Sequence, residues 1–211
     1  MSIGRVILSL CDFSGAWSEP YGLAGYDVRR IDLQHGQDVR LLPWIEEPVH
    51  GILAAPPCTH FSRAGARYWK EKGIEPIIEG LAIVDACLRA AAIYRPEWWC
   101  LENPIGRLKD YLGPPQWRFD PWQFGDPYTK RTWLWGHFTP PTPLFAPRAR
   151  CEVEPIFTAP GGVSSTHPGR DRKTAPGINF RDHTTHLGWG RKIERSITPA
   201  GFAQAFFEVN P

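Results

Sequence analysis

The sequence has no long hydrophobic run. No stretch of its 211 residues approaches the roughly 18 consecutive apolar residues that a membrane-spanning helix needs. Its start, MSIGRVILSLCDF, carries one arginine and a short apolar segment before Asp12, which is too short and too polar for a secretory signal. We therefore expect a soluble cytoplasmic protein with no membrane partner, and a monomer is favoured.

Paired cysteines are also missing. The five cysteines are odd in number and widely spaced, and none belongs to a C-x-x-C pair. This pattern argues against a disulfide framework and against a structural zinc site. Cys151 with His183 and His186 could be imagined as metal ligands, but one cysteine and an H-x-x-H in a polar segment form a weak set. We expect no metal site.

The chain as a whole lacks a strong charge of either sign, since its formal net charge is +2. Residues 148–195 are locally basic, which suits either a polyanionic partner or a solvated loop, and both interpretations stay open. Tryptophan, by contrast, is abundant at ten residues. Most of these rings are expected in the core, whereas an exposed few could stack on nucleic-acid bases.

The apolar pattern predicts a layered α/β fold. Apolar residues at helical spacing predict a long helix over 75–95, and Thr198 as N-cap with Pro199 at the first helical position predicts a closing helix over 198–210. Strands that alternate with crossovers imply a mostly parallel central sheet flanked by helices. Short apolar runs predict five such strands, at 5–10, 26–33, 50–55, 97–103 and 132–136.

The composition changes near residue 139, where Pro, Gly, Ser and Thr become frequent and no period is visible. Such a stretch is typical of an extended, loop-rich excursion. We therefore divide the chain into a core over 1–138, a loop-rich region over 139–197 and a closing helix over 198–211 that packs back on the core.

Polar or reactive residues follow four of the predicted strands. They are Asp12 with the loop to Gly15, Asp32, Pro57-Cys58 and Glu102-Asn103. Ligands of parallel sheets sit beyond the carboxyl ends of the strands, so these residues are expected to meet at one functional edge. Asp32 comes about 20 residues after the Asp12 loop, an interval that suits a carboxylate binding a ribose hydroxyl.

Cys58 differs from the other cysteines in its setting. It stands behind two prolines and before the polar stretch THFS, and a loop position of this kind suits a nucleophilic thiolate. Cys11, Cys87 and Cys100 fit the usual role of cysteine as a small buried hydrophobe. Glu102, at the end of an apolar strand, is either a strand-end cap or a group that handles protons.

Four stretches together resemble the ordered motifs of DNA cytosine-5 methyltransferases. They are DFSGAW, PPCTHFS, LENP and WQFGDPYTKRTWLWG (122–136), and the resemblance covers about residues 5–138. It implies a Rossmann-like methyltransferase fold that moves a methyl group from S-adenosylmethionine to carbon 5 of cytosine in DNA. By this resemblance Cys58 would add to carbon 6, and Glu102 would contact ring nitrogen 3 and the exocyclic amine. Pro57 would shape the loop, and Asn103 would help to hold Glu102.

The resemblance also implies a cofactor site. Phe13 and Gly15 match the family's first motif, and Asp32 would bind the ribose hydroxyls. Asp38 with Val39 matches the position that holds the adenine amine. Six residues are assigned to the cofactor in this way: Phe13, Gly15, Trp17, Asp32, Asp38 and Val39.

Three positions depart from the family pattern. Trp17 stands where the family has a further glycine, so its ring could alter how the cofactor sits. Pro104 replaces the valine that usually follows Glu-Asn. The later motif usually reads Gln-x-Arg-x-Arg, and here those positions hold Tyr128, Lys130 and Thr132. Arg131 is out of phase, so either Lys130 or Arg131 is expected to contact the cytosine oxygen.

Size is the largest departure. The family usually carries a separate target-recognition domain, whereas only about 50 loop-rich residues are available here to contact nucleic acid. This implies a compact enzyme of a bacterium, phage or mobile element, with a relaxed or short sequence preference. Two alternatives remain: the same chemistry on a free nucleotide, single strand or RNA or with a modified donor, and a non-catalytic nucleic-acid-binding relative. Cys58 and Glu102 argue against the last, because a binding module needs neither.

Overall fold

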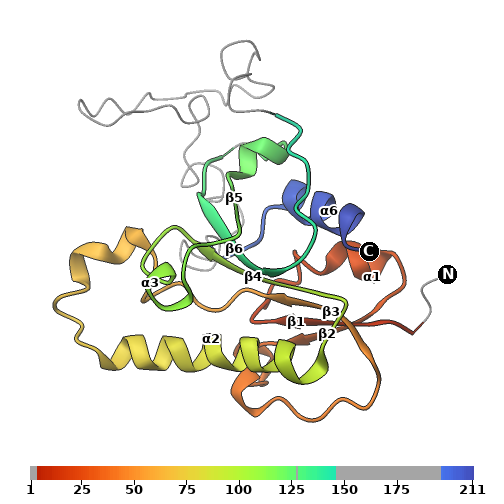
Figure 1. The fold of residues 1–211 in the computed structure, drawn as a ribbon, viewed down its shortest axis with the longest axis horizontal. Helices are drawn as coiled ribbons and strands as arrows, with labels where there is room; N and C mark the ends of the chain where they lie inside the picture. The colour runs from red at the N-terminus through yellow and green to blue at the C-terminus, as the bar shows by residue number, and fades with distance from the viewer. Residues whose placement is uncertain (1–3, 127, 146–195) are drawn as a thin grey trace.

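The computed structural model describes residues 4–126, 128–145 and 196–211. These residues form one six-stranded sheet with helices on both faces (Figure 1). The strands are β1 (Val6–Leu10), β2 (Asp27–Ile31), β3 (Val49–Ala54), β4 (Trp98–Pro104), β5 (Trp117–Phe119) and β6 (Thr132–His137). The α-helices are α1 (Glu19–Leu23), α2 (Glu75–Tyr94), α3 (Lys109–Leu112) and α6 (Ala200–Val209). Short 3-10 helices are η1 (Leu33–His35), η2 (Val39–Leu41), η3 (Arg63–Tyr68) and η4 (Pro121–Phe124).

The sheet is mixed, with the strand order β2-β1-β3-β4-β6-β5. β1 pairs in parallel with β2 and β3, and β3 pairs in parallel with β4, whereas β6 runs antiparallel to both β4 and β5. The expected mostly parallel sheet is therefore confirmed only in part. The reason is the short connection from β5 to β6, which holds one 3-10 turn rather than the crossover helix that usually joins parallel strands.

The five predicted strands and both predicted helices are present, with ends that shift by one or two residues. The strand and α-helices that sequence analysis missed are β5, α1 and α3, which have three to five residues each. Elements this short do not complete enough of a hydrophobic period to be recognised. None of the helices in the described ranges is long and apolar enough to cross a membrane.

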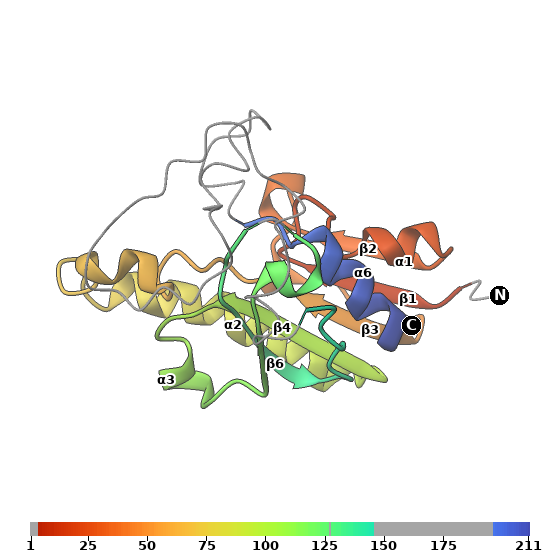
Figure 2. The ribbon, with the colours of Figure 1, turned by 90° about the horizontal axis from the view of Figure 1, so that it is seen from above.

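Side chains alternate between two core layers along the central strands. Val6, Leu8 and Leu10 of β1 enter the cluster that packs against α2, whereas Ile7 enters the cluster that includes α6. This period of two follows from the pleat of a strand. Figures 1 and 2 show the result: α2 covers one face of the sheet, and α1 and α6 cover the other.

Helix α6 closes the second layer through its aromatic rings. Phe202 stacks on Phe119 with ring centroids 3.9 Å apart, and the Tyr21 hydroxyl donates a 2.7 Å hydrogen bond to the carbonyl of Asn210. The predicted N-cap Thr198 is wrong, because Pro199 occupies that position and no side chain of its own caps the helix. Instead the Asp126 carboxylate accepts a 3.2 Å hydrogen bond from the N–H of Gly201, so a distant loop caps this helix.

The buried carboxyl group of Asp126 should make the free energy of unfolding depend on pH. Burial raises the pKa of Asp126 from 3.8 to about 6, against the opposing effect of the backbone amides of α6. The folded state therefore binds a proton more tightly than the unfolded chain, and this stabilisation is lost as the pH rises from about 4 through about 6. We expect Asp126→Asn to remove that dependence in denaturant unfolding at several pH values. The exposed carboxylate of Asp85 provides the control in Asp85→Asn, and curves for Asp126→Asn that run parallel to wild type would contradict the assignment.

Candidate active site

The carboxyl ends of β1 to β4 meet at one edge of the sheet, because these neighbouring strands run in the same direction. Four loops follow from them, beginning at residues 11, 32, 55 and 105. They carry or adjoin most of the site residues predicted from the sequence. Residues 146–195 lie outside the described ranges, as do most of the predicted loop-rich region and the weak metal set Cys151, His183 and His186. Within the part of the chain that is described, no cluster of three or more metal-ligating side chains occurs.

Asp12 organises the loop after β1. Its buried carboxylate accepts hydrogen bonds from the hydroxyls of Ser9, Ser14 and Ser18 at 2.9, 3.1 and 3.1 Å, and from the N–H of Gly15 at 3.0 Å. A buried carboxylate that accepts this many hydrogen bonds fixes the groups around it. Asp12 thus gives the Gly15 loop one defined shape before any ligand arrives.

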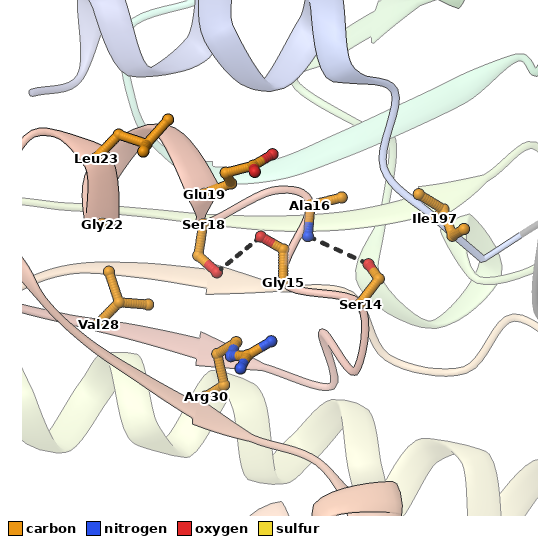
Figure 3. A pocket seen from close by; sticks show the side chains of 10 residues that line it. All are labelled: Ser14, Gly15, Ala16, Ser18, Glu19, Gly22, Leu23, Val28, Arg30 and Ile197. Carbon is orange, nitrogen blue, oxygen red and sulfur yellow. Dashed lines mark hydrogen bonds between the residues drawn. The ribbon is translucent and has the colours of Figure 1, made fainter.

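Gly15 borders a pocket of about 550 Å³ between this loop, α1 and β2 (Figure 3). Its φ of +72° favours glycine, and a Cβ atom there would lie 2.6 Å from a guanidinium nitrogen of Arg30. In Figure 3 the side chains of Val28 and Arg30 rise from β2 toward the loop. The lining residues are Ser14, Gly15, Ala16, Ser18, Glu19, Gly22, Leu23, Val28, Arg30 and Ile197. Sequence analysis missed Arg30, since an exposed arginine inside a strand carries no motif.

The loops after β1 and β2 are joined. His35 contacts the carbonyl oxygen of Phe13 through its Nε2 at 3.0 Å, and Asp32 caps η1 by accepting the N–H of Gln34 at 2.8 Å. This bond engages Oδ1 of Asp32, so Oδ2 is the oxygen that could bind a ribose hydroxyl. The loop that carries Phe13 is therefore tied to η1, which Asp32 caps.

The Asp38 carboxylate is already engaged within its own turn. Arg40 binds it with a closest distance of 2.6 Å, and hydrogen bonds from Arg40 hold the pKa of Asp38 below its usual range. Val39 is buried in the core, so its side chain is not available to a ligand. An adenine amine at Asp38 would have to share the carboxylate with Arg40.

Trp17 is the departure from the family pattern that the structure explains. Its side chain is fully buried and packs against Phe202 and Phe206 of α6, with ring centroids 6.0 and 5.7 Å away. The ring therefore points into the core and away from the pocket. A large residue fits here because α6 supplies an aromatic surface for it to pack on.

Cys58 lies in a turn after β3. Its carbonyl accepts hydrogen bonds from the N–H groups of Phe61 and Ser62 at 3.0 and 2.8 Å, and its side chain is partly exposed. Burial and the nearby Glu102 raise the pKa of Cys100, and a hydrogen bond with Cys11 together with burial raises the pKa of Cys87. A raised pKa depletes the thiolate, so Cys87 and Cys100 are poor nucleophiles.

Asn103 holds the loop that leads into Cys58. The buried Asn103 side chain donates a 2.9 Å hydrogen bond to the carbonyl of Pro56 and not to Glu102. Asn103 therefore holds the chain just ahead of Pro57 and Cys58, a role different from the one the resemblance implied.

Glu102 forms a mostly buried ion pair with Lys130. The Lys130 Nζ lies 3.3 Å from Oε1 of Glu102, yet this oxygen has no partner with hydrogen-bond geometry. We interpret the contact as a close charge pair that leaves acceptor capacity at Glu102. Burial, Asp126 and Glu102 raise the pKa of Tyr128, which sequence analysis did not place beside Glu102. Arg131 is exposed, so the structure brings Lys130 and not Arg131 to the carboxylate.

Comparisons with known proteins leave the family open. No family model matches the sequence, and no curated protein matches it. Among solved structures, the chain is similar to a candidate DNA modification methyltransferase encoded within a prophage of E. coli, with a TM-score of 0.43 and 16% identity. The match covers 63% of this chain and 46% of that chain, so it spans less than half of the other protein. Because a likeness at this level identifies no activity, the function rests on the residues of the site.

Proposed function

We propose that this protein transfers a methyl group from S-adenosylmethionine to carbon 5 of cytosine in DNA. One observation carries the proposal: the loop of Cys58 is tied to β4, the strand that carries the buried carboxylate of Glu102. A thiol on a shaped loop and a carboxylate with spare acceptor capacity are the two groups that this reaction requires.

The chemistry assigned to these residues is as follows. Carbon 5 of cytosine is a weak nucleophile, and addition of the Cys58 thiolate to carbon 6 makes it enamine-like. Glu102 takes up a proton from water and delivers it to ring nitrogen 3, while its other oxygen accepts from the exocyclic amine. Ring nitrogen 3 returns this proton to Glu102 when the cytosine ring is restored. After transfer, a base removes the proton from carbon 5 and the Cys58 thiolate leaves, which restores the aromatic ring. In a duplex the cytosine must first leave the stack to reach both groups.

S-adenosylmethionine supplies the electrophilic methyl group when bound. Of the residues assigned to this ligand, Gly15 lines the pocket and belongs to a loop that Asp12 pre-shapes. Phe13, Asp32, Asp38 and Val39 are not among the residues that line this pocket. Asp32 would hold the ribose hydroxyls through its Oδ2 oxygen, and Asp38 would hold the adenine amine beside Arg40. Lys130 would keep the Glu102 carboxylate oriented toward the base.

Nucleoside mass spectrometry tests the proposal. DNA from cells that express the wild-type protein is digested to nucleosides and compared with DNA from cells without it. We expect deoxycytidine that is heavier by one methyl group and modified at carbon 5. A different mass increment would show that the donor is not S-adenosylmethionine. A methyl group found only in RNA or free nucleotides would show that the substrate is not DNA. Unmodified nucleosides of every class, from a protein shown to be folded, would contradict the proposal.

A further inference from the structure

The backbone beyond Glu102 holds the Cys58 turn on both sides. Residues 103–107, which we call the clamp segment, continue β4 past its ion pair. On the side that precedes Cys58, Asn103 donates to the carbonyl of Pro56. On the side that follows Cys58, the segment forms an isolated antiparallel bridge between Gly106 and Ser62. Cys58 thus lies between two attachments to the same piece of chain.

Arg107 makes the most contacts on the second side. Its N–H donates to the carbonyl of Phe61 at 2.9 Å, and its Nε donates to the carbonyl of His60 at 2.8 Å. Its guanidinium also lies over the ring of Trp69, 4.5 Å from the centroid. One residue therefore engages two carbonyls of the Cys58 turn and the 3-10 segment beyond it. Because the side chain is only partly exposed, these contacts are shielded from water better than surface ones.

Gly106 allows the clamp segment to come this close. A Cβ atom at Gly106 would overlap the carbonyl group of Phe61. The N–H of Arg63 also donates to the carbonyl of Ile105 at 2.9 Å, which completes the contact on the far side of the bridge. The approach is therefore backbone against backbone, and the Arg107 side chain reinforces it.

We propose that Arg107 is a positioning residue for Cys58, and this inference rests on the proposed function. Arg107 fixes the turn that carries the thiol relative to the strand that carries Glu102. Arginine is needed because the Nε–H donor and the planar ring-stacking face belong to one rigid group, which lysine cannot reproduce. A misplacement of about 1 Å at reacting atoms lowers the rate on the order of 10²-fold, so the loss of the Arg107 contacts should be measurable.

The experiment compares Arg107→Met, Arg107→Lys and a matched control. The control is Arg118→Met, since the Arg118 guanidinium also lies over a tryptophan ring, 5.5 Å from the centroid of Trp133. The assays on the full chain are single-turnover methyl transfer at saturating S-adenosylmethionine and DNA, the Kd of an oligonucleotide duplex, and amide hydrogen exchange of the free protein. Exchange at Phe61 and Ser62 reports the turn, and exchange within α2 reports whether the variant is folded.

We expect Arg107→Met to slow methyl transfer by roughly 10- to 100-fold while the Kd for DNA stays within about twofold. Exchange at Phe61 and Ser62 should accelerate by about 10-fold or more while α2 stays protected. Arg107→Lys should behave like Arg107→Met, and Arg118→Met like wild type.

Two results would overturn the inference. If Arg107→Lys restores the rate and Arg107→Met weakens DNA binding as much as it slows transfer, Arg107 acts as a charge on the substrate. If exchange at the turn is unchanged in both variants, Arg107 does not position it. Hydrogen exchange is measured without substrate or cofactor. A wild-type protein that transfers no methyl group would therefore refute the proposed function, while the exchange data would still show whether Arg107 positions the Cys58 turn.

Discussion

Replacing Cys58 by alanine is expected to lower methyl transfer by at least about 10³-fold, since the covalent route then has no nucleophile. DNA that contains 5-fluorocytosine should trap wild-type protein as a covalent adduct, because fluorine at carbon 5 cannot leave as a proton. Intact-mass spectrometry should find one protein joined to one DNA strand with wild type and none with Cys58→Ala. Peptide mapping should place the adduct on Cys58.

Cys87→Ala is the matched control for the loss of a thiol. Cys87 is buried on α2, and its raised pKa keeps it protonated, so this variant should still form the adduct. The structure keeps the thiols of Cys87 and Cys100 in the core. An adduct that persists in Cys58→Ala, or that maps to another cysteine, would refute the assigned nucleophile.

Replacing Glu102 by glutamine is expected to slow methyl transfer by about 10²- to 10⁴-fold, the usual range for the loss of a general acid. Glutamine keeps the shape of the side chain but cannot deliver a proton to ring nitrogen 3. Affinity for S-adenosylmethionine, measured by calorimetry, should stay near the wild-type value, because the predicted cofactor residues lie in the loops after β1 and β2. Single-turnover rates, taken well below the unfolding midpoint, measure the effect.

Glu97→Gln is the control for this change. Glu97 directly precedes β4, so it lies at the opposite end of the strand from Glu102, and its side chain is exposed while contacting His50 at 3.1 Å. It carries the same substitution without contact with the site, so its transfer rate should match wild type. Unchanged turnover in Glu102→Gln would remove Glu102 from the mechanism, and a rate lost equally in both variants would point to a structural effect.

The sequence was most informative where a pattern repeats locally. The 20-residue helix α2 and the apolar strands β1, β3 and β4 have complete hydrophobic periods, and their existence could be predicted. The direction of β6 could not be predicted, because it depends on the path of the short connection that leads into this strand. The cap of α6 was equally out of reach, since Asp126 and Gly201 are separated by 75 residues.

Some features of the candidate site could likewise be predicted from the sequence, and others could not. The sequence predicted that Cys58 follows one strand, that Glu102 ends the next one, and that both lie at one edge of the sheet. The structure places Cys58 after β3 and Glu102 near the end of β4, and these two strands pair with each other. The choice between Lys130 and Arg131 stayed open, although successive side chains of an extended chain point to opposite sides, so only one of them could face Glu102. The structure places Lys130 beside Glu102, and which of the two residues contacts the cytosine oxygen stays a prediction. The clamp segment went unnoticed because a bridge between Ser62 and Gly106 depends on the packing of two loops.

The packing of α6 also sets the timing of folding during protein synthesis. Trp17 belongs to a cluster with Phe119 and Phe124 that is completed by Phe202 and Phe206. A ribosome adds about 5–20 residues per second, so Trp17 waits roughly 10–40 s for its last partners to be made. During that interval the aromatic face of the sheet opposite α2 is exposed on the nascent chain. A chaperone that binds the nascent chain would find this aromatic face uncovered until α6 is made, whereas the α2 side of the sheet can pack while translation continues.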